Sequence, residues 1–169
     1  MNTIILDDNK PFLIIGSSGQ EKILTQEIVN KYNSIAINRS DYNVDIIIMS
    51  DVPRINTNFS KCRYFLANEE YKKEFKTDKI IYFKSEYKII SDNFSVLGRF
   101  QFTVTLALNF IKIIKPGAEV YLVGIDHNRG KYKDPKVKRF IERYKKYLKV
   151  YQTDFSSVGW NLEYKELIK

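Results

Sequence analysis

The sequence contains one cysteine, Cys62, and one histidine, His127. A single cysteine cannot form a disulfide within the chain, which favours a reducing compartment, and we expect Cys62 to be a buried strand residue. One histidine and one cysteine cannot build a typical zinc site, and the acidic residues lack the spacing of an EF-hand. The sequence therefore predicts no obligatory metal and no bound cofactor.

Long apolar runs are also missing. No stretch approaches the ~18 apolar residues that span a bilayer. Residues 1–8 carry acidic side chains where a signal peptide needs basic ones. We therefore expect a cytoplasmic protein with no membrane span. The length of 169 residues and the hydrophobic content of 44% fit one domain over residues 1–169.

Short apolar runs without polar alternation recur along the chain, and such runs are typical of strands buried on both faces of a parallel sheet. They cover residues 12–15, 34–38, 45–49, 62–67, 79–83 and 119–123, with a last short candidate at 150–151. Helical patterns cover residues 20–31, 68–76, 97–115 and the segment after Pro135. Residues 84–94 are ambiguous, and we treat them as a loop with room for a short strand. The tail over 160–168 is expected to close over an edge.

The alternation of strands and helices defines the expected fold. It predicts one Rossmann-like α/β domain with a mostly parallel sheet flanked by helices.

The formal net charge of +8 has a local source. Ten basic residues between Arg129 and Lys149 face only Asp134 and Glu142, so this segment carries the whole excess. Val137, Phe140, Ile141, Tyr144 and Leu148 have helical spacing, which predicts an amphipathic helix with its charges outward. Such a surface can attract phosphates or nucleic acid, but a lysine-rich solvated face can also serve solubility alone. We favour the solvated face and keep nucleic-acid binding as the alternative.

In open parallel sheets, ligands bind beyond the carboxyl ends of the strands. This rule selects a set of glycine and polar residues: Gly16, Ser17, Ser18, Gly19, Asn38, Ser50, Asp51, Gly98, Arg99, Gly124, Asp126 and His127. The turn over residues 16–19 would let a ligand approach the backbone, although it matches neither the dinucleotide fingerprint nor the P-loop. A tight turn explains it equally well, and Asn38, Ser50 and Asp51 are also common turn and capping residues.

Two members of this set, Arg99 and His127, carry a charged or titratable side chain with a possible role of its own. With Ser95 as the cap of the helix over 97–115, Gly98 and Arg99 would place a guanidinium at the positive end of the helix dipole, where it could hold a phosphate. Arg99 could equally be an ordinary surface residue. An unperturbed histidine has a pKa near ~6.5, so His127 could act as an acid or base, or could have a structural or ligand-packing role.

Two segments of the sequence resemble a known family. The segment Phe12–Gly19 resembles the first strand and glycine turn of the bacterial sialyltransferases of glycosyltransferase family 42. The segment from Gly98 to Leu108, followed by Val120–Asp126, resembles the helix that opens with Ser-Gly in those enzymes and their apolar strand ending in Gly-Ile/Val-Asp. The same layout occurs in proteins related to archaeal 6-hydroxymethylpterin diphosphokinase. The resemblance covers about two thirds of the chain.

The resemblance implies a nucleotide site. In the sialyltransferases the matching positions surround a cytidine monophosphate sugar donor, and here they are Gly16, Ser17, Ser18, Gly19, Asn38, Ser50, Gly98, Gly124 and Asp126. The chain has Leu97 where the family has serine, and after Tyr132 it lacks the lid that brings the sialyltransferase histidine.

Two functions therefore stand as hypotheses. The first is a nucleotide-sugar-binding, glycosyltransferase-like protein, in which Asp126 or His127 acts as base and Arg99 steadies the departing phosphate. This would be a minimal transferase without the lid. The second is a non-catalytic protein of the same fold that binds a nucleotide, a nucleic acid or a protein partner.

Overall fold

The computed structural model describes residues 3–17, 19–50, 59–75, 79–87, 92–93, 96–99, 102–126, 133–153 and 160–169. Within these residues the chain forms one nine-stranded sheet in which all neighbouring strands run parallel. The strands are β1 (Phe12–Ile15), β2 (Asn33–Ile37), β3 (Val44–Met49), β4 (Cys62–Asn68), β5 (Ile80–Tyr87), β6 (Val96–Arg99), β7 (Glu119–Val123), β8 (Lys149–Gln152) and β9 (Glu163–Tyr164). The expected α/β architecture with a parallel sheet is confirmed.

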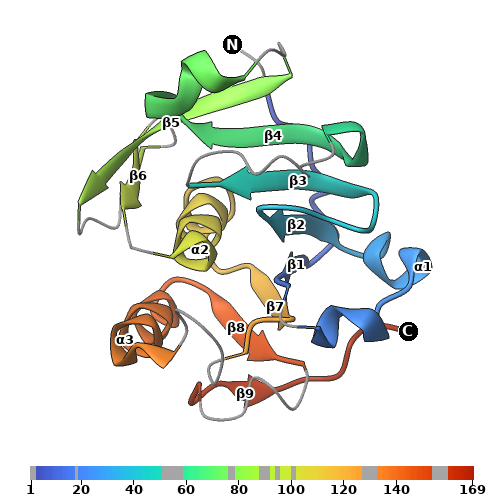
Figure 1. Cartoon of the computed structure of the whole chain (residues 1–169). Helices are drawn as coiled ribbons and strands as arrows, with labels where there is room; N and C mark the ends of the chain where they lie inside the picture. The colour runs from blue at the N-terminus through green and yellow to red at the C-terminus, as the bar shows by residue number, and fades with distance from the viewer. Residues whose placement is uncertain are drawn as a thin grey trace.

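Helices connect the strands. The 3-10 helices are η1 (Gln20–Ile23), η2 (Phe59–Lys61) and η3 (Glu69–Glu74), and the α-helices are α1 (Gln26–Val29), α2 (Thr103–Ile114) and α3 (Pro135–Tyr144). The strand order is β6-β5-β4-β3-β2-β1-β7-β8-β9. In Figure 1 the strands follow one another from β4 near the top to β9 at the bottom, with α2 and α3 on the left and α1 on the right. No described helix is long and apolar enough to cross a membrane.

The strands bury both of their faces, as their continuous apolar runs require. Successive strand residues point to opposite faces of a sheet, so Ile14 enters one core and Leu13 the other. The first core lies under α2 and α3 and includes Val104, Leu108 and Ile141. The second core lies under η1, α1, η2 and η3 and is rich in aromatic side chains.

The long helix expected over 97–115 is shorter than predicted. Residues 96–99 form β6, which pairs with Lys84–Tyr87 of β5, and α2 begins only at Thr103. The N-cap position is Phe102, so the prediction that Ser95 caps this helix is wrong. The apolar period of Leu97 and Val104 suits a helix, but Leu97 is fully buried as a strand residue. Pairing with β5 satisfies the backbone here, and a local period does not reveal such a distant partner.

Other boundaries differ by smaller amounts. The helix expected over 20–31 is split into η1 and α1, because Thr25 caps α1 by accepting a hydrogen bond from Ile28 N at 3.3 Å. Within the charged stretch expected to be helical over 68–76, residues 69–74 form a 3-10 helix whose cap is Asn68. The ambiguous segment after residue 83 continues β5 to Tyr87. The tail does close over an edge, since β9 pairs with β8.

Cys62 opens β4, as expected for a strand residue, but it is half-buried rather than buried. Burial nevertheless raises the pKa of its thiol. A thiol with a raised pKa is a poor nucleophile near neutral pH, so the structural interpretation of Cys62 is the better one.

Candidate site at the carboxyl edge of the sheet

The sheet has a topological switch point between β1 and β7. From β1 the chain proceeds strand by strand to β6 on one side, and from β7 it proceeds to β8 and β9 on the other. The loops that leave β1 and β7 therefore diverge, which is the place where open parallel sheets bind ligands. Gly16 follows β1 and Gly124 follows β7, so two of the predicted glycines stand at this point.

Gly16 and Gly124 are in direct backbone contact. The Gly16 amide donates a hydrogen bond to Val123 O at 2.7 Å. A Cβ on Gly16 would lie 2.2 Å from Gly124 O, which is far inside van der Waals contact. Gly124 itself has a φ of 69°, a conformation that glycine adopts without strain. The packing of the two strand ends thus explains both glycines. The Ile125 side chain adds to this packing, because its Cγ1 would lie 2.9 Å from a Cβ on Gly16.

The rest of the first turn faces outward. Ser17 is exposed, and Gly19 has a φ of 103° and accepts a hydrogen bond from Lys22 N where η1 begins. Ser18, which was predicted to belong to the same turn, lies outside the described residues.

Asn38 and Ser50 end the neighbouring strands β2 and β3. Asn38 has a φ of 67°, and asparagine is one of the few residues other than glycine that accept this conformation. Asn38 turns the chain into the short connection to β3. Its backbone N–H donates a hydrogen bond to Ile48 O at 3.0 Å. The geometry of Asn38 therefore agrees with its interpretation as a turn residue. Asp51 lies outside the described residues.

Ser50 connects β3 to α2. Its Oγ lies 2.8 Å from Oγ1 of Thr103, the first residue of α2. The hydrogen bond brings the N-terminus of α2, the positive end of its helix dipole, to the carboxyl edge of the sheet. Thr103 was not among the predicted site residues, because the apolar pattern predicts a helix that starts at Leu97, six residues before the observed start.

Asp126 follows Gly124 on the β7 side and is only 8% exposed. The preceding residue, Ile125, accepts a hydrogen bond through its carbonyl from the Trp160 indole at 3.1 Å. Trp160 is fully buried and is the only tryptophan in the chain. Nothing in the local sequence pairs these two segments, and Trp160 was not a predicted site residue. His127 lies outside the described residues.

Gly98 and Arg99 do not join this group of residues. They belong to β6, which lies five positions from β1 in the strand order. The prediction that Gly98 opens a helix beside Gly16 and Gly124 is therefore wrong. Arg99 ends a strand instead of beginning a helix, and its side chain is outside what the structure describes.

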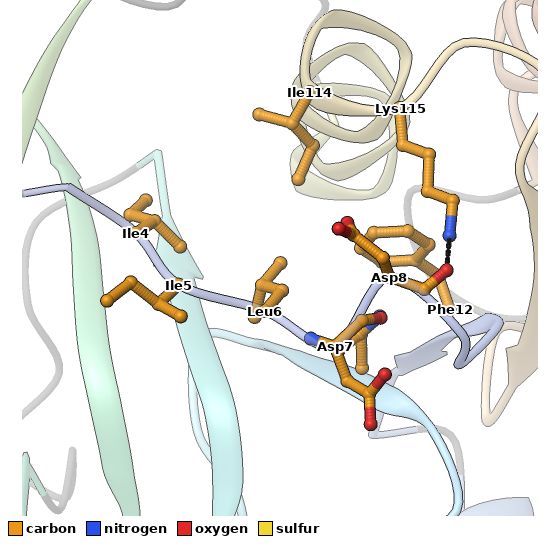
Figure 2. Close-up of a pocket in the computed structure, with 9 residues that line it drawn as sticks. Ile4, Ile5, Leu6, Asp7, Asp8, Phe12, Ile114 and Lys115 are labelled. Atoms are coloured by element: carbon orange, nitrogen blue, oxygen red, sulfur yellow. Dashed lines mark hydrogen bonds between the residues drawn. The ribbon is translucent and has the colours of Figure 1, made fainter.

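A cleft lies at the opposite, amino edge of the sheet. It has a volume of about 280 Å³ and is bounded by the segment Ile4–Asp8 and by the end of α2. Figure 2 shows Ile4 and Leu6 on one side and Ile114 and Lys115 on the other. The Lys115 ammonium donates to Asp8 O, and the Asn33 side chain holds Asp7 through hydrogen bonds in both directions. None of the residues predicted for the nucleotide site lines this cleft.

The fold and the switch point define a class, namely α/β proteins with a parallel sheet and a candidate ligand site at its carboxyl edge. Comparisons with known protein families, curated proteins and solved structures found no match to this chain.

Proposed function

We propose that this chain binds a nucleotide or a nucleotide sugar at the carboxyl edge of its sheet. The observation that carries the proposal is the switch point between β1 and β7, where the chain leaves two adjacent parallel strands toward opposite sides of the sheet. The start of α2 at Thr103, beside Ser50, adds N–H groups that suit a phosphate. The resemblance to sialyltransferases favours a cytidine nucleotide among the alternatives.

In a transferase of this kind, the acceptor hydroxyl attacks the sugar and the nucleotide phosphate leaves with the bonding electron pair. A base takes the hydroxyl proton, and Asp126 and His127 are the candidates closest in sequence to the switch point. The protein would contribute mainly by holding the two reactants in position and by stabilising the charge of the leaving phosphate.

One observation favours the second function, a non-catalytic nucleotide-binding protein. Asp126 is only 8% exposed, so little of its side chain is accessible to an acceptor. Incubation of the protein with CMP-sugars and simple acceptor sugars separates the two functions. Release of CMP that is lost in Asp126→Asn supports the transferase, whereas binding without release supports the non-catalytic protein.

The intrinsic fluorescence of Trp160 can report ligand binding. Trp160 contacts the carbonyl of Ile125, next to the proposed site, and no other tryptophan contributes to the emission. We expect CMP to change the Trp160 fluorescence with a saturable dependence on concentration. A thermal-shift series with CMP, UMP, GMP, AMP and pterins then ranks the ligands, because a ligand that binds only the folded state raises its stability.

A pair of charge variants locates the phosphate. Ser17→Asp places a carboxylate on the exposed turn after β1. It should weaken the binding of CMP at least ~10-fold, about 1.4 kcal/mol, and leave the affinity for cytidine unchanged. Asn9→Asp adds the same charge at the amino edge, where Asn9 is also exposed. It should change the affinity for neither CMP nor cytidine. Equal effects of both variants, or no fluorescence response to any nucleotide, would reject the proposal.

A further inference from the structure

The charge of the chain is concentrated on one surface. Ten of the 28 basic residues and only two of the 20 acidic residues lie between Arg129 and Lys149, which leaves eighteen of each sign elsewhere. Eight of these basic residues are described, and all eight are exposed: Lys133, Lys136, Lys138, Arg139, Arg143, Lys145, Lys146 and Lys149. We call them the α3 basic surface.

The positive charges of this surface are not neutralised by the described part of the chain. None of the eight side chains forms an ion pair there. The two nearby acidic residues are engaged locally. Asp134 accepts a hydrogen bond from Lys136 N at 2.8 Å as the cap of α3, and Glu142 accepts one from the Asn161 side chain at 3.3 Å. The charges are therefore available to a partner of opposite sign.

The arrangement of the charges is regular. Lys136, Arg139 and Arg143 follow one another at intervals of three and four residues, so they lie on one side of α3 with about 5–6 Å between successive Cβ atoms. Each strand of a duplex carries a phosphate about every 3.4 Å of helix axis, so such a row can contact several phosphates of one backbone at once.

The burial of α3 argues against a membrane as the partner. Helices that lie in a bilayer interface insert an apolar face between the lipids. The apolar face of α3 is already used, because Val137, Ile141 and Tyr144 are fully buried in the core beneath it. In Figure 1 α3 lies at the lower left margin of the molecule, where an extended partner has access to it.

We propose that the α3 basic surface binds the phosphate backbone of a nucleic acid, independently of the carboxyl-edge site. The contacts are electrostatic and do not depend on sequence, since they involve phosphates and not base edges. Association should therefore weaken steeply with salt. Three phosphate contacts predict a slope of log K against log salt of about −2.7 for a duplex and about −2 for a single strand.

The test uses the full chain and labelled 20-nucleotide DNA and RNA of mixed sequence, single-stranded and duplex, with fluorescence anisotropy at several salt concentrations. Lys136→Glu/Arg139→Glu should weaken binding at least ~10-fold and make the salt slope about two less steep. Lys22→Glu/Lys73→Glu is the matched control, because it changes the charge equally on exposed residues of η1 and η3 and should have little effect. Lys136→Gln/Arg139→Gln and a circular dichroism spectrum of each variant separate loss of charge from loss of fold.

Three results would overturn the proposal. One is the absence of binding to every nucleic acid at low salt. Another is an equal loss in the two glutamate double variants, which would mean that only the net charge matters. The third is equally tight binding of phosphatidylserine vesicles that is lost in the same variant, which would assign the surface to anionic membranes. The single-stranded and duplex forms distinguish which nucleic acid the surface prefers.

Discussion

Gly16 shows how one residue can be required by packing at a place where a ligand is also expected. Glycine after a strand is a common signal for a phosphate-binding turn, and the same signal arises when two backbones meet. Here the close approach of Gly124 O requires glycine at position 16, because no side chain on that residue fits between the two strand ends. A loss of ligand binding in a Gly16 variant would therefore not by itself identify a ligand contact.

The contact between Gly16 and Gly124 predicts that Gly16→Ala destabilises the protein. The added methyl group would lie 2.2 Å from a backbone oxygen that cannot move away without separating β1 from β7. We expect the free energy of unfolding, measured by urea denaturation, to fall by about 3 kcal/mol. The neighbouring Ser17→Ala changes an exposed side chain and should cost less than about 0.5 kcal/mol. A Gly16→Ala variant as stable as Ser17→Ala would contradict the geometry of this contact.

Among the elements, α3 combines a fully buried apolar face with the α3 basic surface. Its amphipathic pattern was visible in the sequence, and the structure confirms the buried positions Val137, Ile141, Tyr144 and Leu148. Phe140 is half-buried and stacks under the Arg143 guanidinium at 5.2 Å. The helix therefore stabilises the first core while presenting its charges to solvent.

The position of these charges outside the switch point gives a second prediction. Lys138→Glu/Lys145→Glu should leave the affinity for a mononucleotide nearly unchanged, because both side chains are exposed on or just after α3. Calorimetric titration with CMP at fixed salt measures this directly. A large loss of affinity would show that the basic surface forms part of the mononucleotide site.

Tyr144, on the buried face of α3, should lower the free energy of unfolding at alkaline pH. Burial raises the pKa of its phenol far above the ordinary value. In the unfolded chain the phenol loses its proton near pH 10, whereas the folded chain keeps it, so this residue favours unfolding only as the pH rises above about 10. At pH 11 the effect of one such group is about 1.4 kcal/mol.

The variant Tyr144→Phe removes this effect. The difference in free energy of unfolding between Tyr144→Phe and the unaltered protein should therefore shift by about 1.4 kcal/mol in favour of the variant between pH 8 and pH 11. Urea unfolding at both pH values measures this shift. Tyr147→Phe changes an exposed tyrosine on the same segment and serves as the control. If both variants respond to pH alike, burial of Tyr144 is not the cause.

At the scale of the whole molecule, the two proposed sites lie on different elements. The carboxyl-edge site lies at the ends of β1 and β7, and the α3 basic surface lies on the outer side of a helix that covers one core. Saturating CMP should therefore change the affinity for an oligonucleotide less than ~2-fold, a difference of under about 0.4 kcal/mol. Anisotropy titrations with and without CMP measure this coupling, and strict competition between the two ligands would join the surfaces into one site.

Much of the sheet was predictable because its signals are local. The continuous apolar runs of β1, β3 and β7 identify buried parallel strands within a few residues of their true ends. The start of α2 was missed, since residues 96–99 carry an apolar period that fits a helix. Their partner, the end of β5, lies nine or more residues earlier in the chain. The Ser50–Thr103 and Trp160–Ile125 hydrogen bonds were missed for the same reason.

The sequence by itself determined that this chain forms alternating strands and helices, with glycines after two strands and a basic, amphipathic helix near the end. These features follow from the identity of residues close together in the chain, where side-chain periodicity and backbone freedom act directly. Only the tertiary structure decided that β1 and β7 are neighbours, that Gly98 is remote from them, and that α2 begins beside Ser50. Strand order depends on which strands, far apart in the sequence, pair with each other. That choice is made when both cores pack at the same time.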